Sequence, residues 1–220
     1  MQLISVNLGT ATPLEHPHGG KEATGITKRP AAGPVRISAP GPKGVGGSGL
    51  AGDTIVNLKH HGGDDQAVYA FAREDLDHWA AELGRPLPHG SFGENLTTGG
   101  VDVNEALIGE RWRIGGPDGP LLGVSCARIP CRTFADRLGE RGWVRRFTQA
   151  ARPGAYLRVV EPGEVRSGDV VERTHRPDHE VSVTFLFRAC TTEPHLLPGV
   201  LAAGDALPAD IRAAAGKRTD

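Results

Sequence analysis

The chain has 220 residues, of which 38% are hydrophobic and 23% charged, and its formal net charge is −1; this is typical of one soluble domain or of a domain with a small appendage. The balanced charge argues against a nucleic-acid partner, and the apolar runs are too short for a membrane span. Three cysteines leave one unpaired in any disulfide scheme, and no signal-peptide pattern opens the chain, so we expect a cytoplasmic protein.

Short strands are expected to dominate the first part of the chain. Glycine (31 residues) and proline (17 residues) make up more than a fifth of the sequence, a content that favours turns and limits long helices. Alternation of apolar and polar residues predicts strands over residues 2–8 and 35–38, with a loop over residues 9–33 between them.

A glycine-rich stretch over residues 44–49 matches the letters of the dinucleotide-binding pattern G-x-G-x-x-G. That function requires a helix directly after the glycines, because the phosphate lies on the helix N-terminus. Residues 53–58 are instead β-branched and predict a strand, so we reject a dinucleotide-binding loop. After this predicted strand, His61 precedes Gly62 and Gly63, and paired glycines let backbone approach a ligand closely.

The clearest helix is predicted over residues 73–83. Its apolar residues recur at helical spacing and indicate core packing: Leu76, Trp79, Ala80 and Leu83. A glycine and a proline soon after residue 83 end the helix. Residues 90–100 then read as a polar turn bracketed by glycines, in which Glu94 and Asn95 are suitable turn residues.

The second half of the chain continues the pattern of short elements. Strands are predicted over residues 108–114, 121–126, 155–160 and 169–172, and helices over 134–138 and 143–150. Beyond a linker near residues 176–178, we expect one strand over 181–187 and helical segments over 194–203 and 207–215. The fold class is therefore mainly β with short helices (α+β): a β-barrel domain over residues 1–176 and a small helical domain over residues 177–220.

The chemistry of the chain is concentrated in residues 124–131. Cys126 and Cys131 flank Arg128 there, and a nearby guanidinium lowers the pKa of a thiol. Pro130 favours an extended conformation before it, which would present Cys131 at the end of a strand. A thiolate is both a soft metal ligand and a nucleophile. The alternative is that both cysteines act as small buried apolar residues.

Several separated stretches match one known family when they are taken together. They are Gly25-Ile26-Thr27-Lys28-Arg29-Pro30, Gly49-Leu50-Ala51-Gly52-Asp53, His61-Gly62-Gly63, Ala67-Val68-Tyr69, Phe92-Gly93-Glu94-Asn95-Leu96, Ile108-Gly109, Arg128-Ile129-Pro130-Cys131 and Gly154-Ala155-Tyr156-Leu157-Arg158-Val159. In this order they resemble the MOSC-domain family, named for the C-terminal module of molybdenum-cofactor sulfurases, and specifically its free-standing bacterial YiiM-like branch. The tail resembles the small three-helix domain that follows MOSC in this branch.

The resemblance implies a β-barrel-like fold whose pocket binds a pterin-based molybdenum cofactor, with Cys131 as the sulfur ligand to molybdenum. The cofactor-binding residues that it implies are Lys28, Arg29, His61, Gly62, Gly93, Glu94, Asn95 and Arg128. Cys131 and His61 are the expected catalytic residues, with His61 as proton donor. Family members of known activity reduce N-hydroxylated compounds with electrons from a separate flavoprotein, so we expect a substrate of the hydroxylaminopurine or amidoxime type.

One departure from the family pattern concerns the second thiol. Where related sequences commonly read Ser-Gln-Pro-Arg, this chain has Ser125-Cys126-Ala127-Arg128. Cys126 is therefore an inert replacement, a resolving thiol or an extra sulfur near the metal. Two other functions stay open: a non-catalytic carrier of the cofactor or of sulfur as a Cys131 persulfide, and a zinc-stabilised barrel that uses Cys126, Cys131 and His61, although no C-x-x-C pair supports zinc.

Overall fold

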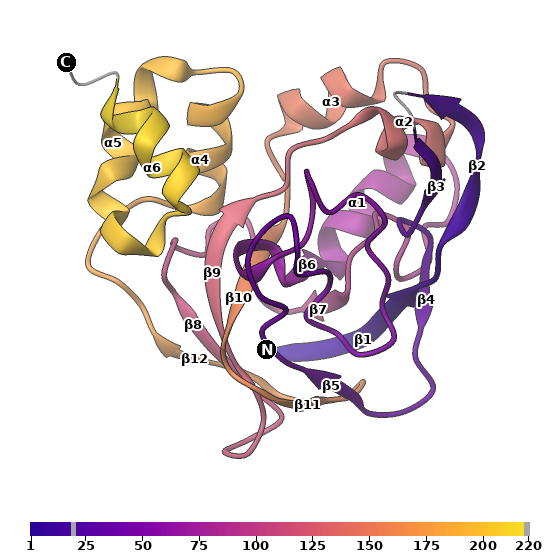
Figure 1. The fold of residues 1–220 in the computed structure, drawn as a ribbon, viewed down its shortest axis with the longest axis horizontal. Helices are drawn as coiled ribbons and strands as arrows, with labels where there is room; N and C mark the ends of the chain where they lie inside the picture. The colour runs from indigo at the N-terminus through magenta and orange to yellow at the C-terminus, as the bar shows by residue number, and fades with distance from the viewer. Residues whose placement is uncertain (19–20, 218–220) are drawn as a thin grey trace.

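An eight-stranded mixed sheet forms the centre of the molecule in the computed structural model, which describes residues 1–18 and 21–217 (Figure 1). Its strands are β1 (Gln2–Gly9), β4 (Lys28–Pro30), β6 (Val68–Ala72), β7 (Leu96–Gly99), β8 (Arg111–Ile114), β9 (Leu121–Ala127), β10 (Ala155–Glu161) and β12 (Val171–His175). The order across the sheet is β12-β8-β9-β10-β6-β7-β1-β4. Among the described strands, only β6 and β7 run parallel, and helix α1 (Arg73–Leu83) makes the crossover between them.

The strand β1 also approaches the opposite edge of the sheet. The Leu3 N–H donates to the Asp169 carbonyl, the Gly168 N–H donates to the Leu3 carbonyl (both 2.8 Å), and one bridge pairs Gln2 with Val170. These contacts reach the first residue of β12, where the Val171 N–H donates to the Met1 carbonyl at 2.9 Å, but they do not extend into a ladder. The expected α+β class is thus confirmed and takes the form of a large sheet with helices, whereas the expected closed barrel is not found among the described residues.

Two small two-stranded sheets lie beside the large one, and both include strands from the first third of the chain. Strands β2 (Thr12–His18) and β3 (Lys21–Thr24) form a hairpin, so the prediction of a loop over residues 9–33 was wrong. Strand β5 (Val35–Ile37) pairs with β11 (Gly163–Val165). Residues 53–58 form no strand, because no neighbouring strand pairs with them and β-branched residues alone do not fix an extended conformation.

Three helices cover one side of the sheet and enclose an aromatic core. Helix α1 ends as predicted, with Gly84 in the left-handed conformation (φ 64°). Helices α2 (Arg132–Leu138) and α3 (Trp143–Ala150) pack beside it (Figure 1). The largest side chains of this aromatic cluster are Trp79, Phe92, Phe134, Trp143 and Phe147. Phe92 comes from the segment predicted as a polar turn, and residues 96–99 of that segment form the buried strand β7, which corrects the prediction.

The tail is helical, as the sequence predicts. It contains α4 (Val183–Cys190), the 3₁₀ turns η2 (Pro194–Leu196) and η3 (Leu201–Ala206), α5 (Leu197–Val200) and α6 (Ala209–Gly216). The strand predicted over residues 181–187 is wrong, because Ser182 caps α4 by accepting the Phe185 N–H and Val183, Leu186 and Phe187 form its buried face. These side chains belong to the same hydrophobic cluster as Leu122 and Val124 of β9. The division of the chain at residue 176 into a sheet domain and a helical domain stays a prediction.

None of the helices in the described residues combines the length and the hydrophobicity that a membrane crossing requires.

Candidate functional site

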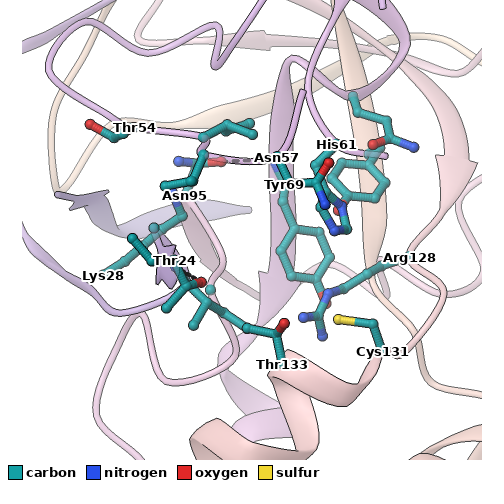
Figure 2. Close-up of a pocket in the computed structure, with 18 residues that line it drawn as sticks. Thr24, Lys28, Thr54, Asn57, His61, Tyr69, Asn95, Arg128, Cys131 and Thr133 are labelled. Carbon is teal, nitrogen blue, oxygen red and sulfur yellow. Dashed lines mark hydrogen bonds between the residues drawn. The ribbon is translucent and has the colours of Figure 1, made fainter. Parts of the chain in front are cut away.

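A cavity opens between β6, β10, the start of α2 and the loops over residues 23–28 and 54–61 (Figure 2). The volume of the cavity that is open to the centre of a water-sized molecule is about 110 Å³. The structure brings six of the sequence-predicted site residues together in its lining: Lys28, His61, Gly93, Asn95, Arg128 and Cys131. The cavity is therefore the candidate functional site.

Cys131 lies at the junction between a strand and a helix. Strand β9 ends at Ala127, and residues 128–130 lead to Cys131, which is the N-cap of α2 with extended backbone angles (φ −132°, ψ 171°). Its side chain is half-buried and lines the cavity. Figure 2 shows the thiol on the same side of the cavity as the guanidinium of Arg128. The prediction that Pro130 presents Cys131 after a strand agrees with this placement.

Arg128 is a buried cation without a carboxylate partner. It is 6% exposed, and its guanidinium lies 3.8 Å from the Phe134 ring centroid and 5.3 Å from that of Tyr69. Its Nη1 has no hydrogen-bond partner, and no ion pair joins Arg128 to an acidic residue in the part of the chain that the structure describes. Contact with aromatic rings offsets only part of the cost of burying the charge. An anionic ligand in the cavity would satisfy the free N–H.

Two tyrosines form the wall next to Arg128. The rings of Tyr69 on β6 and Tyr156 on β10 lie 5.2 Å apart, because β6 and β10 pair these two residues directly. Burial raises the pKa of Tyr69 well above its ordinary value and raises that of Tyr156 to about 12. The Tyr69 hydroxyl donates to the Pro153 carbonyl at 2.7 Å. Both phenols therefore stay neutral near pH 7 and do not neutralise the arginine.

Lys28 is held in a buried ion pair with Asp53. Burial lowers the pKa of Lys28, and the Asp53 carboxylate opposes that shift. Asp53 also accepts the Gly9 N–H at 2.7 Å and the Asn95 amide at 2.9 Å. The remaining polar atom of Asn95, its Oδ1, accepts the Tyr69 N–H at 3.1 Å. The polar groups of Asn95 are thus used within the protein, where they fix β6 and the Lys28–Asp53 pair.

His61 lines the cavity from a loop that two glycines shape. Gly62 and Gly63 both have positive φ angles (80° and 78°), and a Cβ on either would lie 2.7 Å from the backbone of Gly47 or Lys43. The glycine-rich stretch that mimics a dinucleotide fingerprint is therefore the surface on which the His61 loop packs.

Three predicted site residues lie outside the cavity lining. The Glu94 side chain is fully buried and accepts the N–H groups of Gly90 and Phe92 and the Thr97 hydroxyl, so it holds the turn that shapes one wall. Arg29 is exposed on β4, and Gly62 packs beneath the His61 loop. Their roles in cofactor binding stay predictions.

Sequence reasoning also missed several residues that line the cavity. They are Thr24, Asn57, Gln66, Tyr69, Thr133 and Tyr156. Both tyrosines lie in stretches that carry the family resemblance, Ala67-Val68-Tyr69 and Gly154-Ala155-Tyr156. The family resemblance of these two stretches could have identified the tyrosines as site residues, although the pairing of Tyr69 with Tyr156 across β6 and β10 is not visible in the sequence.

Cys126 lies in a different environment. It is buried in β9 and lines a second cavity, between the sheet and the tail, together with Cys190 and Phe187. Burial raises its pKa to about 12. A zinc site needs Cys126, Cys131 and His61 together, but Cys126 is not in their cavity, and residues 1–18 and 21–217 hold no group of three His, Cys, Asp or Glu suited to a metal ion.

A model of the MOSC domain matches residues 57–172, which is more than half of the chain and includes His61 and Cys131. The chain belongs to the MOSC domain family. This MOSC protein is 35% identical over 186 residues to the uncharacterized protein YflK of Bacillus subtilis, across 84% of this chain and 79% of YflK. It is 29% identical over 131 residues to protein YiiM of Escherichia coli, across 58% of this chain and 57% of YiiM. A Gibberella moniliformis protein named Reductase is 31% identical over 169 residues, and the match covers 75% of this chain and 28% of that protein.

Solved structures support the same assignment at the level of the fold. The crystal structure of YiiM from Geobacillus stearothermophilus has a TM-score of 0.77 at 23% identity, over 100% of this chain and 99% of that one. YiiM from Escherichia coli has a TM-score of 0.70 at 20% identity, over 99% and 92% of the two chains. Together with the family match, they identify a YiiM-like MOSC protein whose fold extends over the helical tail.

Proposed function

We propose that this MOSC protein is a molybdenum-cofactor-dependent oxidoreductase that reduces N-hydroxylated small molecules to the corresponding amines or amidines. The observation that carries the proposal is the buried guanidinium of Arg128, whose Nη1 has no hydrogen-bond partner, in the same cavity as the Cys131 thiol. A free thiol suits a soft metal, and a desolvated arginine suits an anionic phosphate or oxygen.

The residues present fit such a cofactor. The free Nη1 of Arg128 is a donor without a partner, and Gly93 (φ 80°) brings bare backbone to the wall. Cys131 is half-buried and not blocked by a disulfide. Arg128 would hold the anionic part of the group, and Cys131 would supply its sulfur to the metal. The Lys28–Asp53 ion pair would add a fixed dipole at the wall of the cavity that Lys28 lines, and the hydrogen bond from the Asn95 amide would hold Asp53 in place.

The proposed reaction is R–NHOH + 2 e⁻ + 2 H⁺ → R–NH₂ + H₂O. When bound, the cofactor supplies the two-electron chemistry that breaks the N–O bond. The protein orients the substrate in a cavity with two aromatic walls and supplies a proton to the departing hydroxyl. His61 is our candidate for that proton donor because it lines the cavity and histidine is the side chain most often used as a general acid. A separate flavoprotein reductase is the proposed electron donor, and the proposed compartment is the cytoplasm.

The test uses protein expressed in a host that makes the cofactor, with reduced viologen as the electron source. Hydroxylaminopurine and benzamidoxime are the substrates, and amine or amidine formation is the readout. We expect turnover that Cys131→Ser removes and that Cys126→Ser, as the matched control, retains. Full molybdenum loading without reduction of either compound would overturn the reductase proposal and favour the carrier function.

A further inference from the structure

A groove between the β2–β3 hairpin and helix α2 is continuous with the cavity that Cys131 lines. One wall is formed by β2, β3 and residues 24–27, and the other by α2 and the residues that follow it up to 141. We call this the α2 groove. Thr24, Ile26 and Thr133 line both the groove and the Cys131 cavity. A ligand that enters the cavity therefore has room to extend along α2.

The α2 groove carries two cations whose charge the protein leaves free. Arg137 and Arg141 line it and are exposed, and neither takes part in an ion pair among the described residues. The two acidic residues of the groove, Asp136 and Glu140, are already paired with arginines that do not line it. The uncompensated charge of the groove is therefore positive.

The position of these cations along the helix suits a ligand that is anchored at Cys131. Cys131 is the N-cap of α2, and Arg137 comes six residues later, which is about 9 Å along the axis. The Gly139 N–H caps the carbonyls of Ala135 and Asp136, which weakens the repulsion that the C-terminal end of α2 exerts on an anion. The Arg85 guanidinium donates to the carbonyl of Leu138.

The lining between these two points suits a sugar. Thr133 is buried and offers a hydroxyl with no protein partner among the described contacts, and Thr24 accepts the Ile26 N–H but can still donate. Pro13 and Leu14 add an apolar wall. A ribose presents both hydroxyls and an apolar ring face, so this stretch matches it in polarity.

We propose that the α2 groove is a subsite for the ribose phosphate of an N-hydroxylated nucleotide, with the base in the Cys131 cavity and the phosphate between Arg137 and Arg141. This inference rests on the proposed function and narrows its substrate class from the free base to the nucleotide. The spacing of about 9 Å along α2 is comparable with the reach from the exocyclic nitrogen of a base to its 5′-phosphate. The phosphate gains charge-assisted hydrogen bonds that a free base lacks.

The experiment measures equilibrium binding and turnover on cofactor-loaded protein. Binding compares adenosine 5′-monophosphate with adenosine, and turnover compares N6-hydroxyadenosine 5′-monophosphate with N6-hydroxyadenosine. Exposed charge pairs predict a loss of roughly fivefold in nucleotide affinity for Arg137→Gln or Arg141→Gln and about 20-fold for both together, with adenosine binding unchanged. The preference for the nucleotide should also fall as salt is raised, because the arginines are exposed.

The matched control is Arg111→Gln with Arg145→Gln, which removes the same charge from exposed positions that line neither cavity. The control should keep the nucleotide preference. Equal binding of nucleotide and nucleoside by the unmodified protein, or an equal loss in the control, overturns the subsite. A fall in molybdenum and pterin content in the Arg137 and Arg141 variants also overturns it, because the groove would then hold the phosphate of the cofactor. Arginine-dependent nucleotide binding without any N–O reduction would support the subsite and refute the proposed reaction.

Discussion

Cys131 and Cys126 lie close in sequence but line two different cavities. Cys131 follows the end of β9 and is half-buried in a cavity with the guanidinium of Arg128, whose Nη1 has no hydrogen-bond partner. Cys126 lies within β9 and faces a second cavity against α4 and α6, where burial raises its pKa to about 12. Thiol chemistry depends on the surroundings, so the comparison predicts one reactive sulfur and one structural sulfur in the same motif.

The surroundings of Cys131 and of Cys126 also differ in whether their charged groups are paired with groups of opposite charge. The Cys131 side buries a cation among aromatic rings and leaves one of its N–H groups free. The tail side buries apolar residues, and its charged groups near Cys126, such as Asp65 and Arg158, pair with each other at 2.5 Å. A buried donor without a partner is costly, and a ligand that completes it is one explanation for its presence beside a cavity. The difference is therefore our reason for placing the ligand site on the Cys131 side.

The largest expected effect is on metal content. Cys131→Ser should lower bound molybdenum by more than roughly 100-fold, because a serine hydroxyl stays protonated near neutral pH and binds the metal poorly. Cys126→Ser should keep molybdenum near the level of the unmodified protein. Metal analysis of both purified variants makes the measurement. Equal losses in the two variants would contradict the comparison and indicate that the thiols act as a pair.

A second pair of variants separates packing from ligand binding. Phe134 and Phe187 are both fully buried, one beneath Arg128 and the other against the tail side of the sheet. Each change to alanine should lower the free energy of unfolding by about 3–5 kcal/mol, measured by urea denaturation. Only Phe134→Ala should also lower molybdenum content under folding conditions, because it removes the ring on which Arg128 lies. An equal loss of metal in Phe187→Ala would count against this assignment.

Arg128→Met should raise the free energy of unfolding of the cofactor-free protein but lower its binding of the cofactor. It removes a buried charge whose desolvation is only partly offset by ring contacts, so the cofactor-free protein should gain about 1–2 kcal/mol of unfolding free energy. Cofactor content should fall, because the anionic group loses its donor. Denaturation of the cofactor-free protein and metal analysis of the loaded protein are the two measurements. A destabilised variant that binds the cofactor normally would show that Arg128 is structural.

The smallest expected effect concerns pH and Cys126. The folded pKa of about 12 lies above the ordinary thiol value, so the stability that the neutral thiol contributes is fully present below pH 9 and is lost as the pH rises toward 12. Above about pH 9, the unmodified protein should lose up to about 1.4 kcal/mol per pH unit more than Cys126→Ala. If the free energies of unfolding of the unmodified protein and of Cys126→Ala changed equally between pH 9 and 10, the Cys126 thiol would not be shielded from water.

Local patterns in the sequence were sufficient for the elements that short-range forces specify. The apolar stripe and the glycine after residue 83 determined α1, and Pro130 with the preceding apolar run indicated that Cys131 follows a strand. The motif match also identified six residues that share the cavity. The helix end and the strand before Cys131 depend on neighbours a few positions away, which a single sequence displays, whereas the six cavity residues came from the family resemblance.

Only the tertiary structure decided which polar groups are used within the protein and which stay free. Glu94 and Asn95 look like equal ligands in the sequence, yet both are occupied with backbone and side-chain partners, whereas the Nη1 of Arg128 has no hydrogen-bond partner. The tail segment 181–187 has strand-like composition, but the Ser182 cap and burial against the β9 side make it the helix α4. Pairing partners, burial and the free charge of Arg137 and Arg141 arise from contacts between distant residues, and for that physical reason the sequence alone does not determine them.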